Sequence, residues 1–401
     1  MKKAKFQIGI GNITIDSQAK KNVLRVLDST RLTYGDFTRK FESEMARLHD
    51  RRWAIFCNSG TSALMVALQV LKDKYEWGDS DEVLVPSVTF IATANVVLHN
   101  RLKPVFVDVE GEYFGIDPTK IEERISKRTK AIIPVHLFGQ SCAMDEIIKI
   151  AAKHRLKIVE DSCEVMFIKY RGKPVGSQGD IACYSTYATH LITTGVGGLA
   201  MTNDDDLAVR MKSYFNHGRD GIYLSIDDDD TGNPSQLLKI VERRFSFIHL
   251  GHSLRLTEME AALGLAQLSK WQNIIARRQE NASYLTEHLA VWSKYLQLPK
   301  IRPDCQHAFM LYPIVVTNPK INREDLVNFL EVNGIETRYL MPLLNQPIYK
   351  KLFGNIEDEY PVAKFLNKNG FIIGCHQDLT LSELDHIVNT FSDFFKKGDS
   401  L

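Results

Sequence analysis

Short apolar runs alternate with helical patterns from about Trp53 to Tyr214, and this alternation limits the fold more than any other feature of the chain. We expect strands at 54–60, 82–87, 104–109, 131–139, 157–161, 180–187 and 197–203, and helices at 61–73, 90–100, 144–155 and 204–215. The expected strands are apolar along their length, which is typical of strands that are buried on both faces. The pattern therefore predicts an α/β fold with a mostly parallel sheet that is covered by helices on both sides.

A long helical pattern at 257–290 follows and would link this first unit to a second one. Beyond it we expect short strands at 309–317, 334–341 and 370–374, and helices at 324–333 and 381–397. Mixed short strands and helices of this kind predict a smaller α+β domain. We place the large domain, with its N-terminal arm, at 1–265, and the linking helix with the small C-terminal domain at 266–401.

The charge and cysteine content of the chain limit which kinds of molecule it is expected to bind. Lys and Arg number 50 against 49 Asp and Glu, so no strong field favours nucleic acid or a membrane surface. The six cysteines are scattered without a C-x-x-C pair, and no apolar run approaches the ~20 residues of a membrane span. The acidic segment 221–234 is interpreted as an exposed loop rather than a metal site. We expect a cytoplasmic protein without a metal, a nucleic-acid partner or a membrane anchor.

A run of small residues, CNSGTSAL at 57–64, stands between an expected strand and an expected helix. Backbone N–H groups at a helix N-terminus bind phosphate well. Gly60 would allow close approach of the backbone, and Thr61 would add a hydroxyl donor. A simple helix cap is the alternative, because Ser and Thr are good N-caps.

Two further segments place polar side chains at strand ends. Asp161 ends the run KIVED, at the edge of a parallel sheet where ligands gather. It either caps the next loop or faces a cationic ring nitrogen, because an unpaired buried charge is costly. His190 follows a strand and a hydroxyl-rich turn, and it is either a hydrogen-bonded structural residue or a general base.

Taken together, these segments resemble the DegT/DnrJ/StrS family of sugar aminotransferases over nearly the whole chain. The resemblance is carried by the ordered motifs CNSGTSAL, VPSVTFIATANVV, IPVHLFGQ, VEDSCE, GSQGDIACYST, TTGVGGLAMTND, GHSLRLTEMEAALGLAQL and GFIIGCHQDLT. It implies the three-layer aspartate-aminotransferase fold, which is fold type I, and a cofactor that is pyridoxal 5'-phosphate (PLP) or pyridoxamine 5'-phosphate (PMP). It also implies a homodimer with active sites between the subunits.

The resemblance assigns roles to individual residues. Gly60, Thr61 and Ser185 would hold the cofactor phosphate, and Phe90 would stack on the pyridine ring. Asp161 would pair with the protonated ring nitrogen and keep the ring an electron sink.

Two site residues depart from the family. Glu164 falls near the ring hydroxyl, where many relatives have Gln. Ser253, in the segment GHSLRL, falls where relatives have an Asn that reaches the partner subunit's cofactor phosphate.

The main departure is at the residue that normally binds the cofactor covalently. Relatives resemble S-F-x-x-x-K-x-x-x-x-G-E-G-G in the segment that here reads STYATHLITTGVGG, so His190 replaces the lysine and Val196 replaces the Glu. An imidazole cannot form the Schiff base that a lysine amine forms, but it can take a proton from the methylene carbon of the cofactor. Such a replacement is known in a branch of the family that resembles the PMP-dependent keto-sugar 3-dehydratases.

This branch implies a lyase that removes the 3-hydroxyl of a nucleotide-linked 4-keto-6-deoxy sugar and leaves a 3-deoxy-4-keto sugar. L-glutamate would recharge the cofactor, since the scattered cysteines provide no set of ligands for an iron–sulfur cluster. A product of this kind fits the biosynthesis of a lipopolysaccharide O-antigen and other deoxysugar pathways. The alternatives are an aminotransferase in which His190 is adapted to the proton transfers, a non-catalytic family member, and a chain in which a natural lysine has been replaced.

Overall fold

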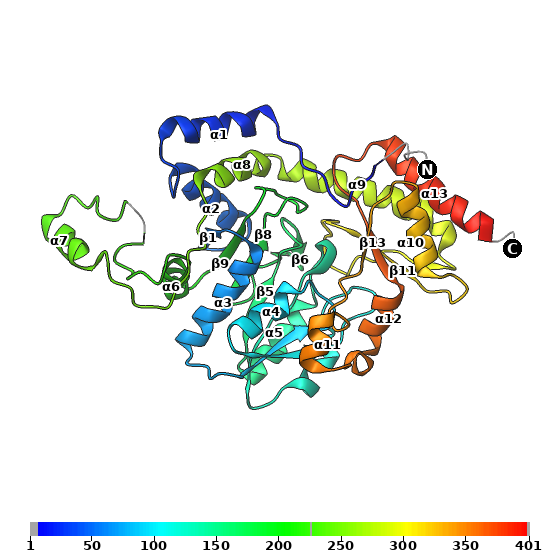
Figure 1. Ribbon diagram of the computed structural model, residues 1–401, viewed down its shortest axis with the longest axis horizontal. Coiled ribbons are helices and arrows are strands. Elements are labelled where there is room, and N and C mark those ends of the chain that lie inside the picture. Colours follow the sequence, from blue (N-terminus) through cyan, green and yellow to red (C-terminus); the bar gives the residue numbers. More distant parts are fainter. Residues whose placement is uncertain (1–6, 225–226, 399–401) are drawn as a thin grey trace.

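The computed structural model describes residues 7–224 and 227–398 of the chain (Figure 1). It confirms the predicted α/β class, with a large, mostly parallel sheet followed by a smaller α+β unit. Residues 225 and 226 of the predicted acidic loop lie outside the described residues, as do the outer ends of the two predicted domains.

The large sheet has seven strands in the order β1-β9-β8-β5-β4-β2-β3. Their bounds are β1 (Trp53–Cys57), β2 (Glu82–Pro86), β3 (Lys103–Val107), β4 (Thr129–Ile132), β5 (Lys157–Asp161), β8 (Ile181–Ser185) and β9 (Gly198–Thr202). From β8 to β3 every neighbouring pair is parallel, whereas β9 runs antiparallel to both of its neighbours. The carboxyl ends of β2, β4, β5 and β8 therefore meet at one edge of the sheet, which is where α/β proteins bind ligands.

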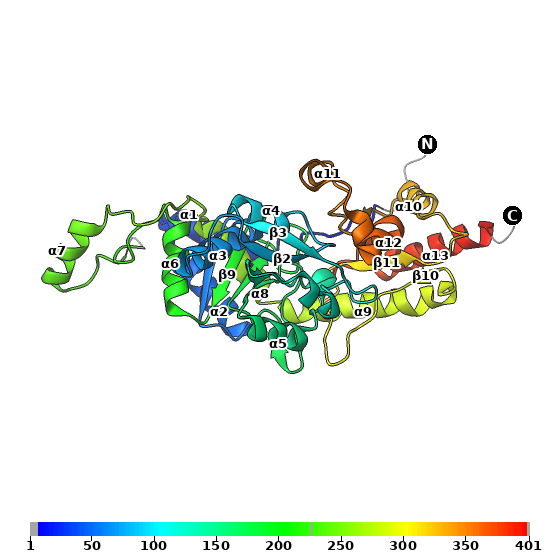
Figure 2. The same cartoon turned by 90° about the horizontal axis from the view of Figure 1, so that it is seen from below.

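Helices cover both faces of this sheet. Those that contact its strands are α2 (Asp36–Leu48), α3 (Gly60–Lys74), α4 (Ala92–His99), α5 (Met144–His154) and α6 (Asp205–Phe215). The helices α1 (Ser17–Ser29) and α8 (Glu258–Leu268) pack on each other, and α8 also packs on α2. The step from β2 to β3 and the step from β4 to β5 run in opposite directions across the sheet. Right-handed crossovers then put α4 and α5 on opposite faces, as Figure 2 shows.

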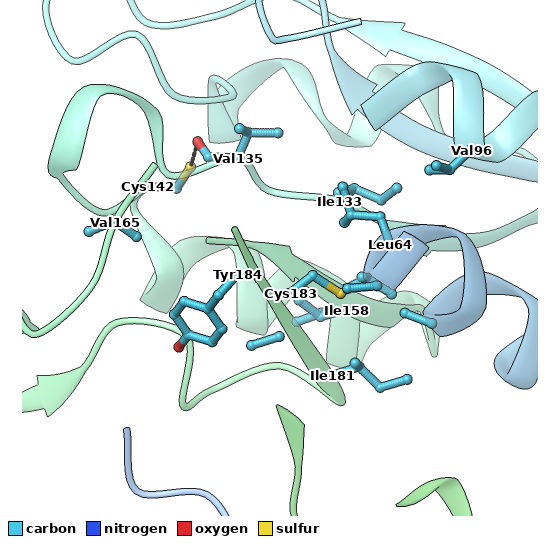
Figure 3. Close-up of a cluster of buried hydrophobic side chains, with 14 of the residues drawn as sticks. Leu64, Val96, Ile133, Val135, Cys142, Ile158, Val165, Ile181, Cys183 and Tyr184 are labelled. Atoms are coloured by element: carbon cyan, nitrogen blue, oxygen red, sulfur yellow. Dashed lines mark hydrogen bonds between the residues drawn. The ribbon is translucent and has the colours of Figure 1, made fainter. Parts of the chain in front are cut away.

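A continuous apolar core joins the sheet to its helices. Figure 3 shows side chains of this cluster that come from four elements: Leu64 of α3, Val96 of α4, Ile158 of β5 and Ile181 of β8. Nearby, Cys142 Sγ donates a hydrogen bond of 3.0 Å to the carbonyl oxygen of Val135. Because interiors of this kind are close-packed, the strand ends that carry the candidate site are held in fixed positions.

The second unit is built on a four-stranded sheet in the order β10-β11-β13-β12. Its strands are β10 (Leu296–Gln297), β11 (Tyr312–Val316), β12 (Thr337–Tyr339) and β13 (Gly370–Ile373). Its helices are α9 (Trp271–Leu289), α10 (Arg323–Val332), α11 (Pro347–Phe353), α12 (Pro361–Asn369) and α13 (Leu381–Gly398). The predicted boundary at 265 falls inside α8, and this division into domains stays a prediction.

Two smaller elements complete the described chain. The strands β6 (Lys169–Tyr170) and β7 (Lys173–Pro174) form a short hairpin, and α7 (Pro234–Arg243) stands at the far end of an excursion from the body (Figures 1 and 2). Among the described residues, every helix is too short or too polar to cross a bilayer.

Two predicted elements were wrong in extent. The single helix predicted at 257–290 is two helices, α8 and α9, because Lys270 leaves the helical conformation and Trp271, which starts α9, stacks on Phe167 with ring centroids 5.0 Å apart. The strand predicted at 131–139 ends at Ile132. Pro134 has no N–H to continue the ladder, and Phe138 adopts a left-handed φ of 59° in a short turn.

Candidate cofactor and catalytic site

The first turn of α3 packs directly against the ends of β5 and β8. A Cβ atom on Gly60 would lie 2.7 Å from Cys163 Sγ and 2.9 Å from Ser185 Cβ, so only glycine fits. Ser59 is the N-cap: its hydroxyl accepts a hydrogen bond of 3.1 Å from the N–H of Ser62. Among the described residues the N–H groups of Gly60 and Thr61 have no acceptor, as is usual in a first helical turn. The capping alternative thus applies to Ser59 and leaves these two donors for a ligand.

Asp161, at the end of β5, is 4% exposed and uses its two oxygens differently. Oδ1 accepts the N–H of Cys163 at 3.2 Å, which is the loop cap that the sequence left open. Oδ2 accepts the hydroxyl of Thr93 at 2.8 Å, and Thr93 Oγ1 lies 2.8 Å from Thr89 Oγ1. Burial raises the pKa of Asp161, and the bonds from Thr93 and Cys163 counteract that rise. Sequence reasoning missed both threonines, although the segment TFIAT places two hydroxyls one helical turn apart beside Phe90.

Glu160 precedes Asp161 and, by strand alternation, faces the other side of the sheet. Its carboxylate lies 3.0 Å from His136 Nε2 and 3.3 Å from Arg51 Nη2, and it also accepts backbone N–H groups from the turn that follows β7. Burial alone would raise the pKa of Glu160, but the bonds from His136 and Arg51 lower it below its ordinary value. With its charge fully compensated inside the core, Glu160 has a structural role.

Glu164 is a second buried carboxyl near Asp161. Its Oε2 accepts the backbone N–H of Phe138 at 2.8 Å, in the turn where Phe138 has a positive φ. Among the described residues this is the one hydrogen bond of its carboxyl group, and Oε1 takes no part in it. Burial, together with the charge of Asp161, raises the pKa of Glu164 to about 7.

His190 lies in the turn between β8 and β9. Its backbone N–H donates to the carbonyl of Tyr187 at 2.9 Å, and its ring meets the Tyr187 ring edge-on with centroids 6.1 Å apart. The ring is partly exposed, while Nδ1 is buried and has no partner within the described residues. Burial, together with the charge of Arg278, lowers the pKa of His190 to about 4, so the imidazole is neutral near pH 7. A neutral imidazole without a fixed hydrogen bond can accept a proton.

The remaining predicted residues differ in their surroundings. Phe90 is 59% exposed at the start of the turn that leads to Thr93, so one face of its ring is open. Ser185 is buried, and its Oγ accepts the N–H of Tyr187 at 3.3 Å.

Ser253 makes no hydrogen bond to the other predicted site residues among the described residues. It forms a backbone bridge with Asn216 and lies 3.5 Å from Arg255 Nη2, on a cavity of about 910 Å³. The cavity is lined by parts of α2, α6 and the excursion that carries α7, and by none of the other predicted site residues. The residue after Ser253, Leu254, accepts the N–H of Asn58 at 2.8 Å, which brings this segment beside the carboxyl end of β1, just before Gly60.

Comparison with known proteins agrees with this fold. The model of the DegT/DnrJ/EryC1/StrS aminotransferase family matches residues 13–392. A GDP-perosamine synthase from Caulobacter vibrioides is 33% identical over 385 residues, which cover 95% of this chain and 96% of the relative.

Two solved structures share the fold. The Helicobacter pylori aminotransferase of pseudoaminic acid biosynthesis superposes with a TM-score of 0.86 and 26% identity, covering 98% of this chain and 100% of the other. The Escherichia coli GDP-4-keto-6-deoxy-D-mannose-3-dehydratase, solved with bound hydrated PLP, gives a TM-score of 0.86 and 25% identity, covering 96% and 99%. The chain therefore belongs to the DegT/DnrJ/EryC1/StrS aminotransferase family, which has the type I fold of PLP enzymes and uses PLP or PMP as its cofactor.

Proposed function

We propose that this protein is a PMP-dependent 3-dehydratase of a nucleotide-linked 4-keto-6-deoxy sugar, in which His190 is the catalytic base. The observation that carries the proposal is an imidazole whose buried Nδ1 has no hydrogen-bond partner among the described residues. The sequence motif predicts that this residue stands where the family has its Schiff-base lysine. The enzyme would serve a cytoplasmic deoxysugar pathway, such as one that supplies a lipopolysaccharide O-antigen.

The strand-end residues fit the cofactor. The two N–H groups at Gly60 and Thr61 and the hydroxyl of Ser185 would hold its phosphate, and the open face of Phe90 would stack on its ring. Asp161, whose carboxylate is held by two donors, would keep the ring nitrogen protonated. When bound, the cofactor supplies an electron sink for negative charge that develops next to its amine.

The remaining steps of the proposed reaction depend on His190 and on L-glutamate. His190 would accept a proton from the methylene carbon of the cofactor and hold it while the hydroxyl leaves carbon 3 of the sugar. The amine nitrogen would stay with the sugar, and hydrolysis would release it as ammonia. Since residue 190 has no amine, no covalent bond joins the cofactor to the chain at this position. L-glutamate would restore the amine after each turnover.

The direct test is product analysis. The purified protein, loaded with PMP, is incubated with 4-keto-6-deoxy sugars carrying GDP, CDP or dTDP, and the products are analysed by mass spectrometry. Loss of the 3-hydroxyl supports the dehydratase, and retention of all sugar hydroxyls with every substrate would refute it. Incubation of the PLP form with L-glutamate should also yield 2-oxoglutarate and the PMP absorbance.

The second candidate is a nucleotide-sugar aminotransferase. It is favoured by the 33% identity to the GDP-perosamine synthase and by the similarity to the Helicobacter pylori aminotransferase. In the same assay this activity would replace the keto oxygen by an amine and keep the 3-hydroxyl. A third candidate, a non-catalytic family member, would bind no cofactor in an absorbance titration.

We also infer a homodimer. The inference rests on the family role of Ser253, whose position carries an Asn in relatives that reaches the cofactor phosphate of the partner subunit. Light scattering coupled to gel filtration tests this: twice the chain mass supports the dimer, and the mass of one chain contradicts it.

A further inference from the structure

We propose that Thr89 and Thr93 form a hydroxyl relay that favours a negative charge on Asp161, while the neighbouring Glu164 keeps its proton. The two carboxyl groups would then meet the cofactor ring in different states: Asp161 as an acceptor toward the ring nitrogen, and Glu164 as a donor toward the ring oxygen. This inference deepens the proposed site and rests on the cofactor occupying it.

The direction of the relay follows from the number of protons. A hydroxyl has a single O–H to donate. Thr93 Oγ1 lies 2.8 Å from Asp161 Oδ2, and an ionised carboxylate can only accept, so Thr93 gives its proton to Asp161. The contact of 2.8 Å between Thr89 Oγ1 and Thr93 Oγ1 must then be donated by Thr89. Both threonines are 1% exposed, so water cannot replace either bond.

The two carboxyls receive unequal support. Asp161 accepts from the Thr93 hydroxyl and from the N–H of Cys163, one donor on each oxygen. Glu164 is about as deeply buried, but among the described residues it accepts only from the N–H of Phe138. Hydrogen bonds to a carboxylate stabilise its charged form, and two nearby buried carboxylates resist sharing two charges. The proton therefore belongs on Glu164, the carboxyl with fewer donors.

No cation on the neighbouring elements reverses this assignment. On the strand end itself the titratable neighbours are Asp161 and the thiol of Cys163, and neither favours a charge on Glu164. From the turn after β4, His136 contributes its N–H to Glu160 rather than to Glu164. Within the described residues, no Lys or Arg lies within 4.0 Å of the Glu164 carboxyl.

The consequence concerns the ring of the cofactor. A charged Asp161 stabilises a protonated ring nitrogen, whereas a second negative charge at the ring oxygen would be repelled by it. A protonated Glu164 can instead donate its O–H through Oε1, the oxygen without a hydrogen-bond partner in the part of the chain that the structure describes. Glu164 would thereby act as the neutral amide of Gln does, although it is an acid.

The relay is tested with the full-length protein by titration of PMP and PLP, monitored by absorbance. Thr93→Val removes the donor at nearly constant volume, and Thr93→Ser keeps a hydroxyl as the matched control. We expect Thr93→Val to weaken PMP binding by about tenfold or more, because a charged acceptor loses its hydrogen bond. Thr93→Ser should stay close to the wild type, and Thr89→Val should give a smaller loss in the same direction.

The proton on Glu164 is tested by the pH dependence of the bound-cofactor absorbance. In the wild type we expect a transition around pH 7, where Glu164 gives up its proton. Glu164→Gln should bind PMP as the wild type does at pH 6 and should lack this transition. Melting temperatures of the apo forms identify a variant that has failed to fold. The remaining variants then test the relay and the protonation of Glu164.

Equal PMP affinity in Thr93→Val and Thr93→Ser would overturn the relay, and an unchanged pH transition in Glu164→Gln would overturn the proton assignment. Both readouts measure cofactor binding. If the variants behave as expected but the wild type leaves every keto sugar unchanged, the proposed dehydratase activity is refuted and the inference about Asp161 and Glu164 still holds.

Discussion

His136 Nε2 and the Glu160 carboxylate lie 3.0 Å apart in the fully buried core, directly behind the strand end that carries Asp161. The N–H of Cys142 donates to His136 Nδ1 at 3.0 Å, so the proton of the imidazole is on Nε2 and is donated to Glu160. This pair fixes the turn after β4 to the end of β5 and thereby supports the site from behind.

Removing one partner of this pair should therefore destabilise the fold. His136→Ala is expected to lower the free energy of unfolding by about 3 kcal/mol, because it opens a cavity and takes a donor from a buried charge. Urea unfolding of the apo protein measures the change. The control is Lys364→Ala, which breaks an exposed ion pair with Asp358 and should leave stability nearly unchanged. Equal stability of His136→Ala and the wild type would contradict a supporting role for the pair.

Restoring the lysine should restore the covalent link. In His190→Lys loaded with PLP, borohydride reduction should fix the cofactor to the chain, visible as added mass in the intact protein. The wild type should show no such addition, and dehydration by the variant should be suppressed. If His190→Lys dehydrates the keto sugar as fast as the wild type does, His190 is not the base.

The pKa of Glu164 predicts how stability depends on pH. Unfolded, this carboxyl titrates near 4.5, and folded it keeps its proton to about 7. Its contribution is therefore complete below the unfolded pKa and is lost as the pH rises through the folded one, by up to roughly 3 kcal/mol in total. Comparing urea unfolding at about pH 5 and pH 8, Glu164→Gln should lose less stability than the wild type. The exposed Glu242→Gln is the control and should follow the wild type. Parallel losses in all three proteins would refute the buried, protonated state.

Filling the space at Gly60 should impair the cofactor site. In Gly60→Ala the new Cβ would lie 2.7 Å from Cys163 Sγ, so α3 must move away from β5 and β8. We expect PMP affinity to fall by at least about tenfold, since phosphate binding depends on close approach of the backbone at this turn. Gly78→Ala, whose Cβ would be 3.8 Å from the nearest atom, Asp81 Oδ2, is the matched control. Isothermal titration of PMP measures both, and equal affinities would show that the turn does not hold the phosphate.

Much of the fold could be predicted because its signals are local. Strand β5 ends at Asp161 as predicted, since two β-branched apolar residues, Ile158 and Val159, followed by two acids mark a short buried strand and its polar end. The break between α8 and α9 could not be predicted, because it depends on Trp271 stacking on Phe167, far away in the sequence.

In the candidate site, too, some residues could be predicted from local sequence motifs and others could not. Gly60 and His190 stand in motifs that sequence reasoning can identify. Thr93 looks like an ordinary helical residue until the packing of α4 on the sheet brings its hydroxyl to Asp161. The protonation preference of Glu164 likewise depends on the count of donors around it, which only the three-dimensional arrangement provides.

The proposed role of His190 also predicts how the protein retains its vitamin B6 cofactor. Without an amine to hold the vitamer between turnovers, its residence time depends on reversible contacts alone, so occupancy follows the free vitamer concentration by mass action. Dialysis should empty the protein, and its unfolding temperature should rise with each increment of PMP added back.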